Sequence, residues 1–217
     1  MAEDDRSGRG LGIAEPAGPE SAPANSLLAA LERLRSALDR ERAEAPALGA
    51  ELLALPAEAA LERIDREARF QTWGLCELLL AQSAGAGEAG EAAHLATLAL
   101  AGAQRLDPAR HAAAVVEDLK ARAWAALGEA RRRAADLAGA EEALRAAAAC
   151  LSHGTGDLLV EARLLEFEAA VRRGQGRQGE AAALLKLAAA RYRETGEAEH
   201  LKRVLAEREG ILSGKTF

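Results

Sequence analysis

The stretch from Trp124 to Cys150 constrains the fold more than any other part of this 217-residue sequence. Apolar residues recur every three or four positions along it and along the residues just before it, a spacing that predicts amphipathic helices. The first set is Val116, Leu119, Ala123, Leu127 and Ala130, and the second is Leu137, Ala140, Leu144, Ala147 and Leu151. Asp136 stands between the two sets and is a residue type that caps helix N-termini. The pattern predicts two amphipathic helices joined by a tight turn.

Copies of this pattern occur on both sides of it. When the sequence is shifted by 41 residues, the pattern aligns with a later copy. The aligned pairs are Trp124 with Leu165, Gly128 with Ala169, Ala140 with Ala181, Leu144 with Leu185, and Ala147 with Ala188. An earlier and more divergent copy closes with Ala96, Leu100, Ala103 and Pro108. The sequence therefore predicts an all-α chain built from about three helical hairpins.

The spacing resembles the tetratricopeptide repeat (TPR), whose pattern is Trp, Leu and Gly, then a distant Ala, an aromatic residue or Leu, and another Ala. Those positions fall on Trp124, Leu127, Gly128, Ala140, Leu144 and Ala147. Arg131 replaces a preferred Tyr, Ser152 replaces a preferred Pro, and the 41-residue offset exceeds the family period of about 34. The resemblance implies a right-handed solenoid of stacked hairpins, in which the first helix of each unit lines a concave groove. A pair of ordinary bundle helices is the alternative.

Composition and periodicity divide the sequence into four parts. Residues 1–24, rich in Gly, Pro and acidic residues, are predicted to be a disordered tail, and residues 25–66 an N-terminal helical extension. Residues 67–212 are expected to hold the TPR-like repeats and a final helix that caps them or begins a longer array. Residues 213–217 are a short C-terminal tail. From about residue 55 to residue 212, the sequence also resembles a group of bacterial TPR-like proteins to which no activity is assigned.

The N-terminal extension carries a leucine seam. A helix is expected to begin near Asn25 and to end near Ala45, because Pro46 and Gly49 follow. Leucines alternate spacings of four and three along this helix, as in a short coiled coil. They are Leu27, Leu31, Leu34 and Leu38. Two heptads are too few to predict a dimer, so the seam is expected to pack onto neighbouring helices.

Composition narrows the possible functional classes. Alanine dominates, aromatic residues make up only 3% of the chain, and the formal net charge is -6. Nucleic acid repels a negative chain, so direct binding to DNA or RNA is not expected. No apolar run has the length of a membrane span, and the N-terminus lacks the apolar centre of a signal peptide, so we expect a cytoplasmic protein. Cys76 and Cys150 both lie in helical patterns, which favours free thiols over a disulfide.

No motif in the sequence predicts catalysis, a metal or a cofactor. Gly214, Lys215 and Thr216 resemble the end of a phosphate-binding loop, but Glu209 stands where that loop needs glycine. A helix-turn-helix reader in residues 47–66 is rejected, because its second helix carries more acids than arginines. The histidines are scattered without metal-ligand spacing: His94, His111, His153 and His200. An enzyme is therefore not expected.

One pattern does indicate a binding surface, because arginines repeat at the same offsets in two copies of the hairpin. If the TPR geometry applies, four arginines and two glutamates face the groove. They are Arg122, Glu129 and Arg132 in one copy and Arg163, Glu166 and Arg173 in the next. Arginine forks suit carboxylates and phosphates, which predicts an acidic peptide or protein partner. The alternative is that these arginines pair with neighbouring glutamates on an unoccupied surface.

Two functions follow from this pattern. The first is a non-catalytic scaffold that binds a peptide or protein partner in the groove. The second is a sensor or regulatory domain that acts with a transcriptional or signalling partner and takes a small peptide in the same groove. The second rests on analogy of fold alone.

Overall fold

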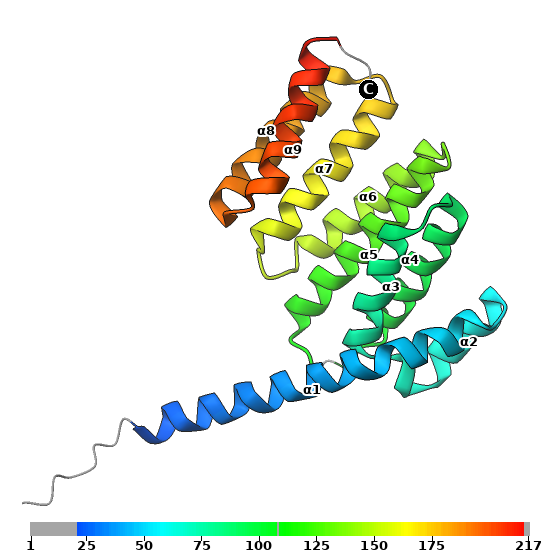
Figure 1. Cartoon of the computed structure of the whole chain (residues 1–217), viewed down its shortest axis with the longest axis vertical. Coiled ribbons are helices and arrows are strands. Elements are labelled where there is room, and N and C mark those ends of the chain that lie inside the picture. The colour runs from blue at the N-terminus through cyan, green and yellow to red at the C-terminus, as the bar shows by residue number, and fades with distance from the viewer. Residues whose placement is uncertain (1–20, 108, 215–217) are drawn as a thin grey trace, which may run out of the picture. The chain divides into compact units, whose positions relative to one another are not determined.

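The computed structural model describes residues 21–107 and 109–214, and every regular element within them is a helix (Figure 1). The elements are α1 (Ser21–Leu53), α2 (Ala57–Arg66), the 3-10 turn η1 (Ala68–Phe70), α3 (Trp73–Gly85), α4 (Ala89–Gln104), α5 (Ala113–Arg133), α6 (Leu137–Leu151), α7 (Leu158–Gly174), α8 (Gln178–Thr195) and α9 (Ala198–Leu212). The predicted all-α class is confirmed. Contacts divide the chain into two units, Met1–Ala37 and Leu38–Phe217, so α1 contributes to both.

In the first unit, α1 begins at Ser21 rather than near Asn25, so the last residues of the predicted tail are helical. The remainder of that tail, residues 1–20, lies outside the described part of the chain. The seam leucines are 46–63% exposed: Leu27, Leu31 and Leu34. The expected packing of this seam onto neighbouring helices stays a prediction.

The predicted end of this helix near Ala45 is wrong, because α1 continues through Pro46 to Leu53. A proline inside a helix costs about 3 kcal/mol, since it removes one backbone hydrogen bond and its ring crowds the preceding turn. Ala45 and Leu52 are almost completely buried on either side of Pro46. Burial of a leucine side chain stabilises by roughly 1.5–3 kcal/mol, so packing of this face offsets the cost of the proline.

The two hairpins predicted from the 41-residue offset are present as α5–α6 and α7–α8. The first turn reverses at Ala135, whose φ is 63°, and the amide of Asp136 donates to the carbonyl of Arg131 at 2.9 Å. The second turn reverses at Gly176, whose φ is 77°. A side chain at left-handed φ is strained by roughly 1–2 kcal/mol, so only the second copy has the residue that this turn prefers.

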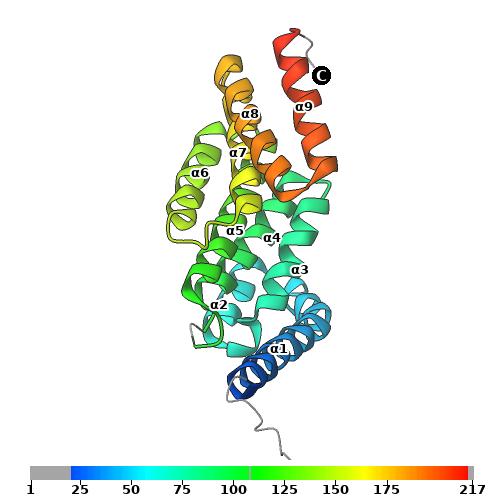
Figure 2. The same cartoon turned by 90° about the vertical axis from the view of Figure 1, so that its left-hand side faces the viewer.

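Within the second unit, each helix from α3 to α9 packs against the next one along the chain (Figures 1 and 2). In addition, α3 contacts α5 and α5 contacts α7, so these three helices form a row. Gly128 on α5 allows the closest approach in this row: a Cβ atom there would lie 2.3 Å from Cζ of Phe167 on α7 and 3.0 Å from Cβ of Ala143 on α6. Trp124 packs against the core on both sides, toward α3 and α4 and toward α6 and α7.

The helices were also compared with the length and apolar character of membrane-spanning helices. Within residues 21–107 and 109–214, none of the helices combines the length and the apolar character that crossing a membrane requires.

Candidate binding surface on α5 and α7

The structure separates the six residues predicted to face the groove into two groups. Three lie on α5 (Arg122, Glu129 and Arg132) and three on α7 (Arg163, Glu166 and Arg173). Four of them form hydrogen-bonded ion pairs and two do not. This division could not be read from the repeat, because equivalent arginines in both copies have the same sequence spacing.

The C-terminal arginines of the set are paired with glutamates. Arg132 binds Glu129 through two parallel hydrogen bonds, Nε to Oε2 at 2.8 Å and Nη2 to Oε1 at 2.7 Å. This pairing raises the pKa of Arg132, and the charge of Glu207 adds to the effect. Arg173 donates from Nη1 to Oε1 of Glu207 on α9 at 2.6 Å. Both guanidinium groups therefore have a carboxylate partner within the protein, as the unoccupied-surface alternative predicted.

Glu166 also has partners, and they come from α8 and α9. Its carboxylate accepts a short hydrogen bond from the hydroxyl of Tyr192 and an ion pair from Arg203, Nη2 to Oε1 at 2.9 Å. The ring of Tyr192 is fully buried, and its burial, followed by the hydrogen bond to Glu166, raises the pKa of its hydroxyl. His200 stacks on this ring at 5.1 Å between centroids and accepts from Nη2 of Arg203 at 2.9 Å. The cluster holds α9 against α7 and α8.

Sequence reasoning missed the α9 half of these contacts. Arg203 and Glu207 occur in a helix that has no copy elsewhere in the chain, so the 41-residue comparison could not find them. Their one available signal was position: both lie on the last helix, whose apolar face had to pack on α8. A charge bordering such a face is a reasonable candidate for an interhelical ion pair, but periodicity does not identify its partner.

Arg122 and Arg163 have no bonded carboxylate. Neither side chain makes a hydrogen bond or an ion pair with any residue of the described ranges. Arg122 is half-buried on α5, whereas Arg163 is exposed on the neighbouring helix α7. Burial lowers the pKa of Arg122, and the positive charge of Arg163 lowers it further, while Glu77 and Asp157 act in the opposite direction. The two guanidinium groups are thus close enough to repel each other.

The two acids whose charges act on Arg122 have hydrogen-bond partners of their own. Glu77 on α3 accepts two hydrogen bonds from Arg42, at 2.8 and 3.3 Å. Burial alone would raise the pKa of Glu77, but the hydrogen bonds from Arg42 and Trp73, with the charges of Arg42 and Arg122, lower it on balance. Asp157 caps the N-terminus of α7, where its Oδ1 accepts from the amide of Leu159 at 2.8 Å. Neither carboxylate is hydrogen-bonded to Arg122, although the charges of both act to raise its pKa.

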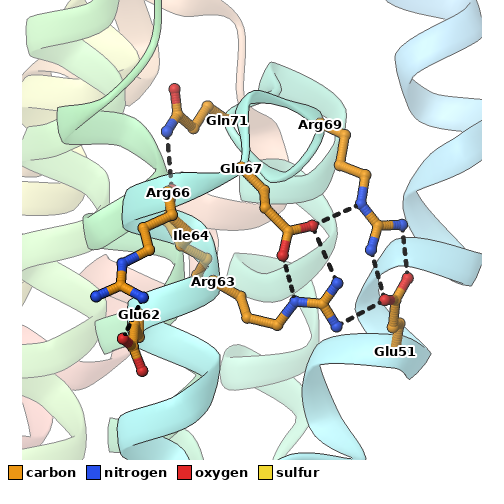
Figure 3. Close-up of polar contacts among 8 residues, drawn as sticks. All are labelled: Glu51, Glu62, Arg63, Ile64, Arg66, Glu67, Arg69 and Gln71. Atoms are coloured by element: carbon orange, nitrogen blue, oxygen red, sulfur yellow. Dashed lines mark hydrogen bonds and ion pairs between the residues drawn. The ribbon is translucent and has the colours of Figure 1, made fainter.

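A second arginine cluster lies at the other end of the unit, where α1, α2 and η1 meet (Figure 3). Arg69 donates to both oxygens of Glu51, at 2.7 and 2.5 Å, and to Glu67 at 3.0 Å. Arg63 binds Glu67 at 2.6 Å and Glu51 at 2.9 Å. The hydrogen bonds from Arg63 and then Arg69 lower the pKa of Glu67 to about 2. Both guanidinium groups also lie over the ring of Phe70, 5.3 and 4.3 Å from its centre.

This α1–α2–η1 network borders a pocket of about 540 Å³. Its lining consists of Glu44, Ala47, Leu48, Ala68, Arg69, Thr72 and Arg110. Because Arg69 is already bound to two carboxylates, the pocket offers little unsatisfied charge to a ligand. The network joins helices and is not a candidate binding site.

The cysteines and histidines give no candidate centre. Cys76 and Cys150 are both free thiols, and burial raises the pKa of Cys76 to about 12, so its thiolate is scarce at neutral pH. Within the described part of the chain, no group of three or more His, Cys, Asp or Glu side chains is placed to hold a metal ion. The candidate site is therefore the surface around Arg122 and Arg163.

In comparisons with known proteins, no family model, no curated protein and no solved structure matches this chain. The TPR-like assignment suggested by the repeat pattern stays a prediction.

Proposed function

We propose that this protein is a non-catalytic binding module with TPR-like stacking, which holds an acidic peptide segment or protein partner against α5 and α7. The observation that carries the proposal is the pair Arg122 and Arg163 on the contacting helices α5 and α7, neither of which has a side-chain hydrogen bond or ion pair among the described residues. A partly desolvated cation without a partner destabilises a fold. A partner that supplies the missing negative charge relieves this cost on binding.

The order of helix contacts supports a TPR-like arrangement. Helices α3, α5 and α7 form a row in which each contacts the next, and α4, α6 and α8 connect them. The resemblance implies that the first helix of each hairpin faces the groove, and in this proposal α3, α5 and α7 are those first helices. Arg122 and Arg163, on neighbouring members of the row, are then aligned along one surface. An extended segment running across the row would meet both.

Charge reversal tests the proposal. The variant Arg122→Glu/Arg163→Glu should recover at least tenfold less acidic partner than the unmodified chain. Affinity capture followed by quantitative mass spectrometry measures this amount. Arg145→Glu is the matched control, because Arg145 is an exposed arginine on α6, outside the row. Circular dichroism and the melting temperature should confirm that all three proteins are folded. Equal recovery by the double variant and the unmodified chain would remove the basis of the proposal.

A sensor or regulatory domain acting with a transcriptional or signalling partner is the second candidate. One observation favours it: the charge of Arg163 reaches Tyr192 in the cluster that holds α9. An anion bound at Arg163 would change the electrostatic environment of Glu166, Tyr192 and Arg203, and so the docking of the last helix. Hydrogen exchange of α9 with and without a bound partner distinguishes this function from a passive scaffold, in which exchange of α9 stays unchanged.

A further inference from the structure

The leucine seam of α1 belongs to a stripe that is buried further along the same helix. Residues seven positions apart lie along one line of a helix, as in a coiled coil. One such line runs through Leu31, Leu38, Ala45 and Leu52. Ala45 and Leu52 are almost completely buried and Leu38 is half-buried, whereas Leu31 is 53% exposed. The stripe therefore changes from buried to exposed toward the beginning of α1.

The exposed part of the stripe is a cluster of leucines and not a single residue. Its members, each 46–63% exposed, are Leu27, Leu28, Leu31 and Leu34. Single exposed leucines are common on protein surfaces, but a contiguous apolar patch marks an interaction site. Among its described residues, the unit Met1–Ala37 contains one regular element, the beginning of α1. That unit therefore offers no second described element to cover the leucines.

The residues that flank the stripe favour a second copy of this chain over a different protein. In a two-stranded coiled coil, charged residues beside the apolar positions select the partner by attraction and repulsion. The flanking positions here are Leu28, Ala30, Arg35 and Ala37. Two copies can pair without bringing Arg35 against itself, because it would face Ala30 in a parallel pair and Leu28 in an antiparallel one. Identical helices therefore meet no like charges.

We propose that the stripe in residues 27–38 is a self-association surface, through which two copies of this chain pair as a short two-helix coiled coil. The pairing is symmetric, so the leucines that one copy contributes are matched by the same leucines of the other. It does not depend on the proposed function, because the stripe shares no residue with α5 or α7.

The area of the stripe predicts a weak, concentration-dependent pair. A leucine side chain that becomes fully buried removes roughly 100 Å² of apolar surface from water, so four half-exposed leucines on each of two copies supply on the order of 400 Å². The flanking alanines and the stem of Arg35 add to this area. Stable interfaces bury about 1,200–2,000 Å², so the pair lies at the small end and its dissociation constant should be on the order of 10 µM.

Analytical ultracentrifugation of the full chain tests the pairing. Between about 1 and 200 µM, the average mass should rise from that of one chain toward that of two. Leu31→Glu should weaken association at least tenfold, because each copy would bring a carboxylate into a leucine layer. Leu187→Glu is the matched control, since Leu187 is 55% exposed on α8, outside the stripe, and it should leave association unchanged. A chain that stays monomeric at the highest concentration, or equal association of the two variants, would overturn the proposal.

Hydrogen exchange distinguishes pairing from coverage of the leucines by the same chain. A short helix without a partner is marginally stable, so the amides of residues 26–37 should exchange at least tenfold more slowly at about 200 µM than at about 1 µM. Leu31→Glu should abolish this dependence on concentration. Full protection already at the low concentration would show that another part of the chain covers the stripe, and a mass of three or more chains would show a larger bundle. Either result contradicts the pairing of two copies.

Discussion

Two pairs of arginines in this protein have the same chemistry and opposite surroundings. In the α1–α2–η1 network, Arg63 and Arg69 share Glu51 and Glu67, so two positive charges meet two negative ones (Figure 3). On α5 and α7, Arg122 and Arg163 meet no carboxylate bonded to either of them among the described residues. The first pair joins helices, and the second is the one that we propose meets a partner. Counting arginines does not separate these roles; only the placement of the counter-charges does.

The largest expected effect comes from changing the distance between α5 and α7. Gly128→Ala places a Cβ atom 2.3 Å from Cζ of Phe167, so the ring of Phe167 or one of the two helices has to move. Overpacking of this kind costs roughly 1–3 kcal/mol, against a gain in helix propensity of about 1 kcal/mol. We expect a net loss of up to about 2 kcal/mol in the free energy of unfolding, measured by urea denaturation, and weaker partner capture.

A glycine without such a neighbour provides the control for this change. Gly90 lies in α4 and has open space around the position of a Cβ atom, so Gly90→Ala should be neutral or slightly stabilising. The double change Gly128→Ala/Phe167→Leu should recover part of the lost stability. If Gly128→Ala is as stable as the unmodified protein and Gly128→Ala/Phe167→Leu is no more stable than Phe167→Leu, the contact between Gly128 and Phe167 does not limit the approach of α5 and α7.

A moderate effect is expected from opening the closed network at Glu67. Its pKa is lowered from 4.5 to about 2, so the carboxylate stabilises the folded state above pH 4.5 and loses that contribution as pH falls toward 2. Glu67→Gln should therefore lower the melting temperature by a few degrees at pH 7, and the difference from the unmodified protein should shrink between pH 4.5 and pH 2. Thermal melts followed by circular dichroism across this range measure both.

The matched change for Glu67 is Glu62→Gln, on the same helix. Among the described residues Glu62 pairs with Arg66 alone, at 2.7 Å between two exposed side chains, and an isolated pair of this kind contributes little. The melting temperature of Glu62→Gln should stay within about one degree of that of the unmodified protein at every pH. Equal effects of the two substitutions would mean that the network stabilises the folded protein no more than a single surface pair does.

Local sequence rules predicted the helices better than the contacts between them. The spacing of apolar residues and the cap at Asp136 were sufficient for α5 and α6, because amphipathic periodicity and capping act within one or two turns. The rule that proline ends a helix failed at Pro46, since burial of Ala45 and Leu52 depends on helices far away in the sequence. Tertiary packing outweighed a local preference there.

The candidate site was predictable only in part, for the same reason. The repeat located all six polar residues on α5 and α7, as the structure has them. It gave no information on which arginines would find an acid, because the partners of Arg173 and Glu166 lie on α9, which has no copy. Charge balance at a surface depends on three-dimensional neighbours, and periodicity describes only one helix at a time.

The smallest expected effect comes from comparing two arginines on α5. Arg122 has no bonded carboxylate among the described residues, whereas Arg132 is bonded to Glu129. Arg122→Met keeps an apolar stem of similar length and removes a half-buried guanidinium that is repelled by Arg163, so the melting temperature should rise by roughly 1–3 °C. Arg132→Met removes two hydrogen bonds to Glu129 and leaves that carboxylate without its partner, so the melting temperature should fall. Differential scanning calorimetry at low salt, where surface charges are least screened, resolves changes of this size. A fall for both variants would show that Arg122 has a counter-charge in solution, and that the pair on α5 and α7 is closed like the one formed by Arg63 and Arg69.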